Sequence, residues 1–424
     1  MNALARTLYN SRDCQQWFAL HPHLSLSLSL IMNSIPLDLL YEIFSRMPTK
    51  SIGRSRCVSE QWRSILCSAD FTEYFLTKSS TRPSLLFAMD RFRSNEFLFF
   101  SSKPSSSLSL AAAYFKLNMQ LEFCGHAAGL FCFRRTQFTR KDWENTVHVI
   151  CNPSLGQYVF LPTLSTSSQT FLGFDPIDKV FKVLSPDDTF SSSFANILTL
   201  GTGEKRWRKV HFPLAHSPVS KGICINGSLY YLARENTTYF IVCFDVRSEK
   251  FKLIQGSFLD SDARLKLINY KGKLGVISLP RENWDSRVGL NIRSKEEVRI
   301  WVLEDGEQQD WSEYAYTLPG DKFRDVECDV LEVYVAGVTS ATGDIVLMNP
   351  NYHHSKPFYV FYFHPERNVI KRVEVQGFGN HGGVVNAFVD HVEDLTFDMK
   401  SWQLDFLKFE SINKFNALCL LEDI

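Results

Sequence analysis

The 424-residue sequence has no excess of charge of either sign and no long hydrophobic run. Lysine plus arginine equals aspartate plus glutamate, at 46 each. A net charge near zero argues against general nucleic-acid binding, which needs a basic surface that displaces counterions from phosphates. No apolar run reaches the ~18 residues that a membrane span needs. We therefore expect neither a nucleic-acid partner nor a membrane partner.

The sequence also lacks cysteines at the close spacing of metal-binding or redox motifs. The ten cysteines include no CxxC pair, and no cysteine or histidine run has the spacing of zinc ligands. Cys151, Cys224, Cys243 and Cys419 lie inside apolar runs, where a free thiol behaves as a small hydrophobic side chain. We expect a reducing compartment, the cytoplasm or the nucleus, and no metal site.

Common catalytic motifs are absent as well. The sequence contains no GxSxG elbow, no HExxH and no Walker-type phosphate loop. The acidic pair Asp187–Asp188 follows Pro186 and is interpreted as a solvated turn. The pair His353–His354 is interpreted as loop, because adjacent strand residues point to opposite faces and cannot hold one ion. We therefore expect no catalytic residue and no cofactor.

Two further groups of residues have unremarkable interpretations. Trp207, Trp301 and Trp311 recur at equivalent positions of a repeat, which favours packing over a ligand-binding cage. Arg134–Arg135 and Arg140–Lys141 alternate with phenylalanine, and we interpret this basic segment as a solvated hairpin.

Residues 1–33 are predicted to be a disordered leader. The segment Leu24–Ile31 alternates leucine with serine, which dilutes any similarity to the core of a signal peptide. A helical pattern begins directly afterwards and leaves no room for a cleavage site and a linker. A targeting role and a translation start at Met32 remain open alternatives.

Helical signals occupy residues 34–78, which we predict to be one small domain of three helices. Pro36 suits the first turn of a helix, and Pro48 is expected to end it. Between them one apolar stripe at helical spacing consists of Leu39, Leu40, Ile43, Phe44 and Met47. Two further short helices are predicted from Ile52, Val58, Trp62, Ile65 and Leu66, with Ser59 as the N-cap of the last one.

From Pro83 onward short apolar strands alternate with turns, and two classes of hairpin repeat. The turn residues of the first class are 49, 45 and 71 positions apart, at Asp178, Gly227, Gly272 and Gly343. Those of the second class are 47, 45, 58 and 61 apart, at Gly156, Gly203, Ser248, Gly306 and Arg367. The dipeptide Asn226–Gly227 is a strong signal for a two-residue turn.

Two hairpins per ~45–60 residues make one four-stranded unit, the signature of a β-propeller blade. Counting a first unit near residues 84–123 and a last near 381–388, we expect about six blades. The long gap in the first class contains Arg281–Arg293, which we interpret as an inserted loop suited to binding. The predicted fold class is α+β and multidomain, with three short helices in residues 34–78 and a large all-β propeller-like domain in residues 79–424.

The helical segment resembles an F-box. The matching elements include Ile35–Leu39, Glu42–Pro48, Arg56–Ser59 and Trp62–Leu66. The resemblance implies docking to a Skp-type adaptor and, through it, to a cullin. The residues that it assigns to adaptor binding or to the core of the F-box are Pro36, Leu39, Ile43, Met47, Pro48, Val58 and Trp62.

The remainder resembles the plant F-box-associated interaction domain, through Gly173–Val183, Cys243–Phe251 and Ile300–Asp305. This resemblance implies a propeller-like receptor for an unknown protein substrate. The predicted function is therefore the non-catalytic substrate-recognition subunit of a Skp–cullin–F-box ubiquitin ligase. Two alternatives remain open: a propeller with its own glycan-binding or hydrolytic activity, and an F-box protein that binds targets without driving their degradation.

Overall fold

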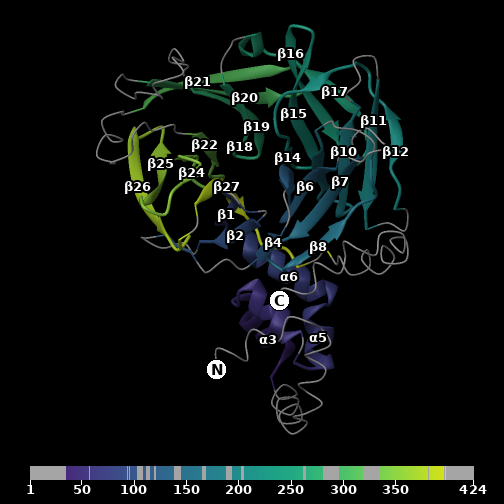
Figure 1. The fold of residues 1–424 in the computed structure, drawn as a ribbon, viewed down its shortest axis with the longest axis vertical. Helices are drawn as coiled ribbons and strands as arrows, with labels where there is room; N and C mark the ends of the chain where they lie inside the picture. The colour runs from purple at the N-terminus through teal and green to yellow at the C-terminus, as the bar shows by residue number, and fades with distance from the viewer. Residues whose placement is uncertain are drawn as a thin grey trace.

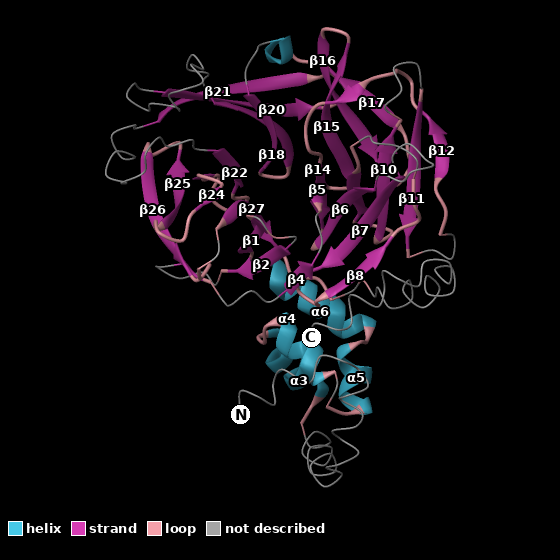
Figure 2. Cartoon of the chain, in the orientation of Figure 1, coloured by secondary structure: helices cyan, strands magenta, loops and turns pink. Residues whose placement is uncertain are grey.

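A computed structural model describes residues 35–397, apart from residues 57, 93, 95, 103–107, 111–114, 119–120, 138–144, 165–168, 188–192, 202–204, 261–263, 280–295, 319–333, 381 and 396. A small group of helices lies at one end of the molecule, and strands form a ring at the other (Figure 1, Figure 2). The predicted leader, Cys419 and the predicted inserted loop Arg281–Arg293 lie outside the described residues.

Four helices make up the small group: α3 (Leu37–Ser45), α4 (Thr49–Ser55), α5 (Glu60–Leu66) and α6 (Ala69–Ser80). Pro36 is the N-cap of α3 and Pro48 is the N-cap of α4. Pro48 was expected to end the first helix, but α3 already ends at Ser45 and Pro48 begins the next helix. A proline fits both places because its missing N–H would have no partner inside the helix. The predicted N-cap is confirmed, since the hydroxyl of Ser59 accepts a hydrogen bond from the Trp62 backbone N–H at 3.1 Å.

Helix α6 was not among the three helices expected from the sequence. Its N-cap is Ser68, whose hydroxyl accepts a hydrogen bond from the Phe71 N–H at 3.2 Å. Phe71 and Phe75 lie one turn apart and are buried, while most of the remaining α6 residues are polar. Two buried apolar residues in twelve give a weak periodic pattern. The signal that would have identified this helix is a serine cap followed by aromatic residues at i+3 and i+7.

The strands form six sheets, which we call blades I to VI. Blade I contains β27 (Gly383–His391), β1 (Ser84–Arg91), β2 (Glu96–Ser101) and β4 (Phe115–Asn118), with β24 (Asn351–Tyr352) beside β27. Blade II contains β5 (Glu122–Ala127), β6 (Leu130–Gln137), β7 (Asn145–Asn152) and β8 (Gln157–Phe160). Blade III contains β9 (Phe171–Asp175), β10 (Val180–Pro186), β11 (Phe194–Leu200) and β12 (Arg208–His211).

Blade IV contains β13 (Ser217–Pro218), β14 (Ile223–Ile225), β15 (Ser228–Glu235), β16 (Thr238–Asp245) and β17 (Phe251–Ile254), and a 3-10 turn, η1 (Ser257–Asp260), follows it. Blade V contains β18 (Arg264–Tyr270), β19 (Lys273–Leu279), β20 (Glu296–Asp305) and β21 (Asp310–Leu318). Blade VI contains β22 (Tyr334–Val338), β23 (Ile345–Met348), β25 (Phe358–His364) and β26 (Val369–Gln376), with β3 (Leu108–Ser109) parallel to β26. The predicted fold class is confirmed: short N-terminal helices precede a propeller of six blades.

The ring closes within blade I, where the last strand pairs with the first. Strand β27 is antiparallel to β1, with Phe87 opposite Ala387 and Met89 opposite Val385. The sequence had suggested separate first and last units, whereas the structure joins them in one blade. This closure leaves no unpaired strand between the two ends of the ring, where an open sheet would expose its edge.

The repeated hairpin turns lie together on one face of the ring. The turn at Gly227 contacts Pro176 in the turn of blade III, and the Asn226 side chain donates a hydrogen bond to the Gly272 carbonyl of blade V at 3.0 Å. Asn226 and Gly227 both have positive φ, 47° and 86°, as a tight hairpin turn requires. The face that carries these short turns also carries the helices.

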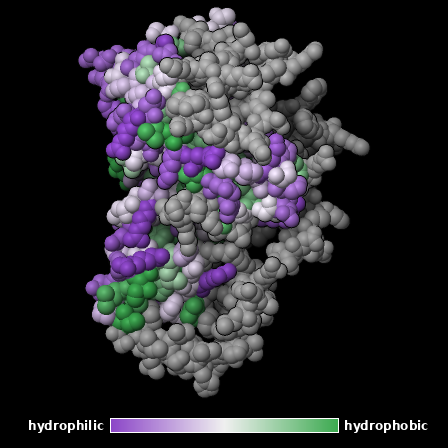
Figure 3. All heavy atoms as spheres, turned by 90° about the vertical axis from the view of Figure 1, so that its left-hand side faces the viewer, coloured by the Kyte–Doolittle hydropathy of each residue, from purple (hydrophilic) through white to green (hydrophobic). Residues whose placement is uncertain are grey.

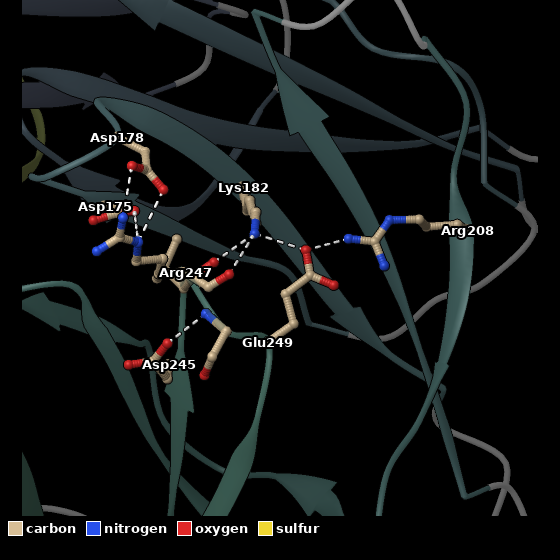
Figure 4. A network of polar contacts seen from close by, with 9 residues as sticks. Asp175, Asp178, Lys182, Arg208, Asp245, Arg247 and Glu249 are labelled. Atoms are coloured by element: carbon tan, nitrogen blue, oxygen red, sulfur yellow. Dashed lines mark hydrogen bonds and ion pairs between the residues drawn. The ribbon is translucent and has the colours of Figure 1, made fainter.

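Apolar layers between blades hold the ring together, and polar contacts supplement them. In one layer Phe171 of blade III stacks on Tyr231 of blade IV, with ring centroids 4.2 Å apart. Figure 4 shows a polar link between the same blades, in which Lys182 donates to the Val246 carbonyl at 2.6 Å and pairs with Glu249 at 2.6 Å. Each blade is therefore stabilised by its neighbours, as expected for a repeat that cannot bury both faces alone.

Candidate functional site

The apolar stripe of α3 divides into a buried side and an exposed side. Leu40 and Phe44 are 4% and 3% exposed and belong to the core of the helices. Leu37, Leu39 and Ile43 are 51%, 52% and 51% exposed. Since a soluble helix normally turns its large aliphatic residues inward, three half-exposed ones on a single short helix indicate a contact surface.

The seven residues assigned to the F-box by resemblance fall into two groups. Pro36, Leu39, Ile43 and Pro48 are exposed around α3, whereas Met47, Val58 and Trp62 are partly buried. Trp62 packs edge-on against Phe44, with ring centroids 5.0 Å apart. The first group is therefore available to a partner, while Met47 and Trp62 also serve the core. Figure 3 shows hydrophobic residues gathered low on the molecule, at the height of α3 in Figure 1.

A polar cluster holds α3 against α6. The Glu42 carboxylate accepts hydrogen bonds from the Tyr74 hydroxyl at 2.5 Å and from Arg46 at 2.6 Å, and Lys78 lies 3.4 Å away. The hydrogen bonds from Tyr74 and Arg46 lower the pKa of Glu42 to about 2, and Lys78 contributes to the same shift. Glu42 is therefore ionised at every physiological pH and keeps the exposed side of α3 in a fixed orientation.

The chain that follows β27 connects the helices to the propeller. Leu395 is 4% exposed and packs in the same core as Phe75, the core of the helices. The Glu393 backbone N–H donates to the Ser79 hydroxyl of α6 at 3.0 Å. Within blade II, the Asn152 side chain donates to the Asp394 carbonyl at 2.9 Å. One segment thus contacts both parts of the molecule.

Two further contacts fix which face of the ring the helices occupy. Leu155, in the turn between β7 and β8, packs against the core of the helices. Lys179, in the turn between β9 and β10, forms an ion pair with Glu73 of α6. Both turns belong to the face that carries the repeated hairpin turns. Because neighbouring strands of a blade are antiparallel, the other ends of the strands, and η1 after β17, belong to the opposite face.

The other candidates from the sequence take part in packing or lie at the surface. The Trp207 and Trp311 indoles donate hydrogen bonds to the carbonyls of Pro162 at 2.8 Å and of Gln255 at 2.9 Å. Trp301 stacks on Phe258 with centroids 4.6 Å apart. These contacts agree with the packing interpretation of the three tryptophans.

The structure describes only some residues of the histidine, acidic and basic pairs that the sequence analysis considered. His353 is exposed and lies beside Phe92, at 5.7 Å between centroids. Arg134 pairs with Glu122 at 2.8 Å. Asp188, Arg140 and Lys141 lie outside the described residues.

Neither a metal cluster nor a membrane span appears in the part of the chain that the structure describes. No group of three or more histidine, cysteine, aspartate or glutamate side chains among the described residues is arranged to hold an ion. No described helix is long and apolar enough to cross a membrane. Cys151 is buried in a strand of blade II, as expected for a thiol in an apolar run, and burial raises its pKa well above the usual value.

Comparison with known proteins covers both parts of the molecule. The family model of the F-box domain matches residues 32–74, and that of the F-box associated beta propeller domain matches residues 84–392. Putative F-box protein At1g33020 of Arabidopsis thaliana is 45% identical over 390 residues, which cover 87% of this chain and 67% of that protein. F-box protein At3g57590 of the same plant is 44% identical over 412 residues, which cover 92% and 96%.

Proposed function

The chain belongs to the family of F-box proteins with an F-box associated β-propeller domain, and from this premise we propose that it is the substrate-recognition subunit of a Skp–cullin–F-box ubiquitin ligase. In this role the helices bind a Skp-type adaptor, which links the chain to a cullin. The propeller binds the protein that is to receive ubiquitin.

The observation that carries the proposal is the exposed side of α3. Leu37, Leu39 and Ile43 lie on a helix that the described part of the chain holds in place but does not cover. Burying aliphatic side chains against a partner is the main favourable term in most protein associations. We assign Leu39 and Ile43, with Pro36 and Pro48 beside them, to direct contact with the adaptor. Met47, Val58 and Trp62 are assigned to supporting that surface.

The proposed mechanism is proximity, and it requires no catalytic residue from this chain. A receptor that holds its target near a ubiquitin-charged enzyme raises the effective concentration of the target's lysines. Such a receptor works best when the distance between its two binding surfaces is fixed. The contacts of Leu395 and Glu393 with the helices, and of Asp394 with blade II, support a fixed arrangement.

The proposed target surface is the face of the ring turned away from the helices. There the target does not compete with the adaptor, which approaches α3 on the other side. The longer connections of a rigid scaffold are also where binding residues usually lie. The part of this face that the structure describes includes η1 and the ends of the innermost strands.

The proposal is tested by mixing the purified full-length chain with a purified Skp-type adaptor and separating the mixture by size-exclusion chromatography. We expect a stable complex with one copy of each protein. Adding a cullin N-terminal domain should give a complex of three proteins. If the folded chain elutes apart from the adaptor at micromolar concentrations of both, the proposed function is wrong.

A further inference from the structure

Two lysines from neighbouring blades lie inside the ring, at the end away from the helices, close enough for their charges to repel each other. Lys221 immediately precedes the short stretch leading into β14 of blade IV, and Lys266 is near the start of β18 of blade V. Both strands run from that end toward the short turns that contact one another on the helix side, at Gly227 and Gly272. Both lysine side chains are nevertheless exposed to solvent.

The Lys221 amine extends past blade III to blade II. It is 4.9 Å from the centre of the Phe123 ring, which belongs to β5 of blade II. Blade III lies between blades II and IV in the ring, so this contact spans the interior and is not a contact between neighbouring blades. Gly222 permits the approach, because a Cβ there would lie 2.7 Å from a ring atom of Phe171.

Lys266 extends from blade V to blade VI. Its amine donates hydrogen bonds to the carbonyls of Val335 at 2.5 Å and Ala336 at 3.0 Å, in β22 of blade VI. A lysine amine has three N–H donors, so these two bonds leave one donor for another acceptor. Desolvation by the surrounding blades lowers the pKa of Lys266 to about 8, and repulsion from Lys221 contributes to the shift.

Lysines that link neighbouring blades occur elsewhere in the ring, but with a carboxylate beside them. Lys182 bonds to the Val246 carbonyl and pairs with Glu249 at 2.6 Å. Lys252 bonds to the Gly306 carbonyl and pairs with Glu307 at 3.3 Å. Within the described part of the chain no carboxylate forms an ion pair with Lys221 or Lys266; the nearby Glu122 pairs instead with Arg134.

We propose that Lys221 and Lys266 form a binding site for an anionic side chain of the target protein, with Phe123 as one wall. The site rests on the proposed function, since it lies on the face assigned to the target. An anion placed between two amines replaces their mutual repulsion with attraction to both. The anion also accepts a charge-assisted hydrogen bond from the remaining N–H of Lys266. A carboxylate and a phosphate share this chemistry.

Two buried histidines near the pair add no positive charge to it. Burial lowers the pKa of His126 to about 4, and the charge of Lys266 adds to the effect. Burial likewise lowers the pKa of His391 to about 3. Both imidazoles are therefore neutral at pH 7, and neither adds to the charge of the two amines.

The site is tested by titrating the full-length chain with three blocked amino acids, the N-acetyl N-methylamides of phosphoserine, glutamate and serine. Binding is followed by NMR of ¹³C-methylated lysines, whose signals are identified with the variants Lys221→Gln and Lys266→Gln. The matched control is Lys271→Gln, because Lys271 also lies over an aromatic ring, 5.5 Å from the centre of Tyr270, but in a turn on the helix side.

We expect the anionic compounds, but not the serine compound, to shift the two lysine signals with saturation. Lys221→Gln should weaken binding about tenfold or more, the usual effect of losing one charged partner, and Lys271→Gln should leave it unchanged. Saturation with phosphoserine alone identifies a phosphorylated target; saturation with both anions shows that a carboxylate suffices. Lys221→Gln is the main variant, because Lys266→Gln also breaks two hydrogen bonds to blade VI.

The proposal is wrong if the serine compound shifts the same signals equally, if none of the three compounds binds, or if Lys221→Gln binds as tightly as the unmodified chain. Adaptor binding is measured on the same preparations, and Lys221→Gln should bind the adaptor normally. If the unmodified chain does not bind the adaptor, the proposed function is wrong. The anion titration still decides whether the two lysines bind an anion.

Discussion

Replacing Leu39 and Ile43 together by alanine should abolish most of the affinity for a Skp-type adaptor without unfolding the chain. Each side chain is about half exposed, 52% and 51%, so roughly half of its surface remains to be buried by a partner. Full burial of such a side chain contributes ~1.5–3 kcal/mol, and the remaining half about 0.8–1.5. The pair then accounts for about 1.5–3 kcal/mol of binding, a ten- to hundredfold change in Kd.

Two controls separate loss of contact from loss of structure. Leu40→Ala removes a side chain that is 4% exposed in the core of the helices, and should cost ~2–5 kcal/mol of stability. Val369→Ala truncates an aliphatic residue whose exposure is similar to that of the pair, 54%, but on blade VI, and should change neither binding nor stability.

The assay is biolayer interferometry with purified adaptor, with a thermal melt of each variant followed by circular dichroism. The double variant should melt within a few degrees of the unmodified chain. If it is folded and binds the adaptor within threefold of the unmodified chain, α3 does not form the interface and the reasoning from its exposed side is refuted.

Three other changes test the packing of the fold. Leu395→Ala should loosen the helices while the propeller stays protected, as hydrogen–deuterium exchange would show; equal loosening of both would contradict the role of this segment. Gly173→Ala places a Cβ 2.7 Å from a methyl of Val246, so it should cost ~1–3 kcal/mol in urea unfolding, with partial rescue by Val246→Ala. Burial, helped by Arg134, lowers the pKa of His148 to about 4, below its unfolded value of ~6.5. The unfolded chain therefore binds the extra proton first, and stability falls as the pH drops from 6.5 toward 4. The buried His126 and His391 contribute to the same fall, so His148→Gln should make it shallower without removing it, in melts across this range.

The propeller could be predicted because its turns repeat in the sequence. The turns at Gly227, Gly272 and Gly343 are tight and need residues that adopt positive φ, so their spacing marks the blades directly. Closure of the ring left no such mark. The pairing of β27 with β1 joins residues about three hundred positions apart, through alternating apolar residues that would suit many partners.

The candidate site could be predicted in part. The apolar stripe of α3 was expected as one surface, but a pattern with period 3.6 cannot show which side of a wide stripe the chain itself covers. The structure buries Leu40 and Phe44 and leaves Leu39 and Ile43 exposed. The lysine pair had no sequence signal, because Lys221 and Lys266 are brought together only when the blades are arranged around the ring.

The central claim is that one chain connects a Skp-type adaptor and a cullin to a target protein. The most direct test is affinity capture of the full chain from plant cells in which the proteasome is blocked, beside the Leu39→Ala, Ile43→Ala double variant. We expect the unmodified chain to capture adaptor, cullin and a further protein, and the double variant to retain only the further protein. Capture of neither adaptor nor cullin by the unmodified chain would contradict the account.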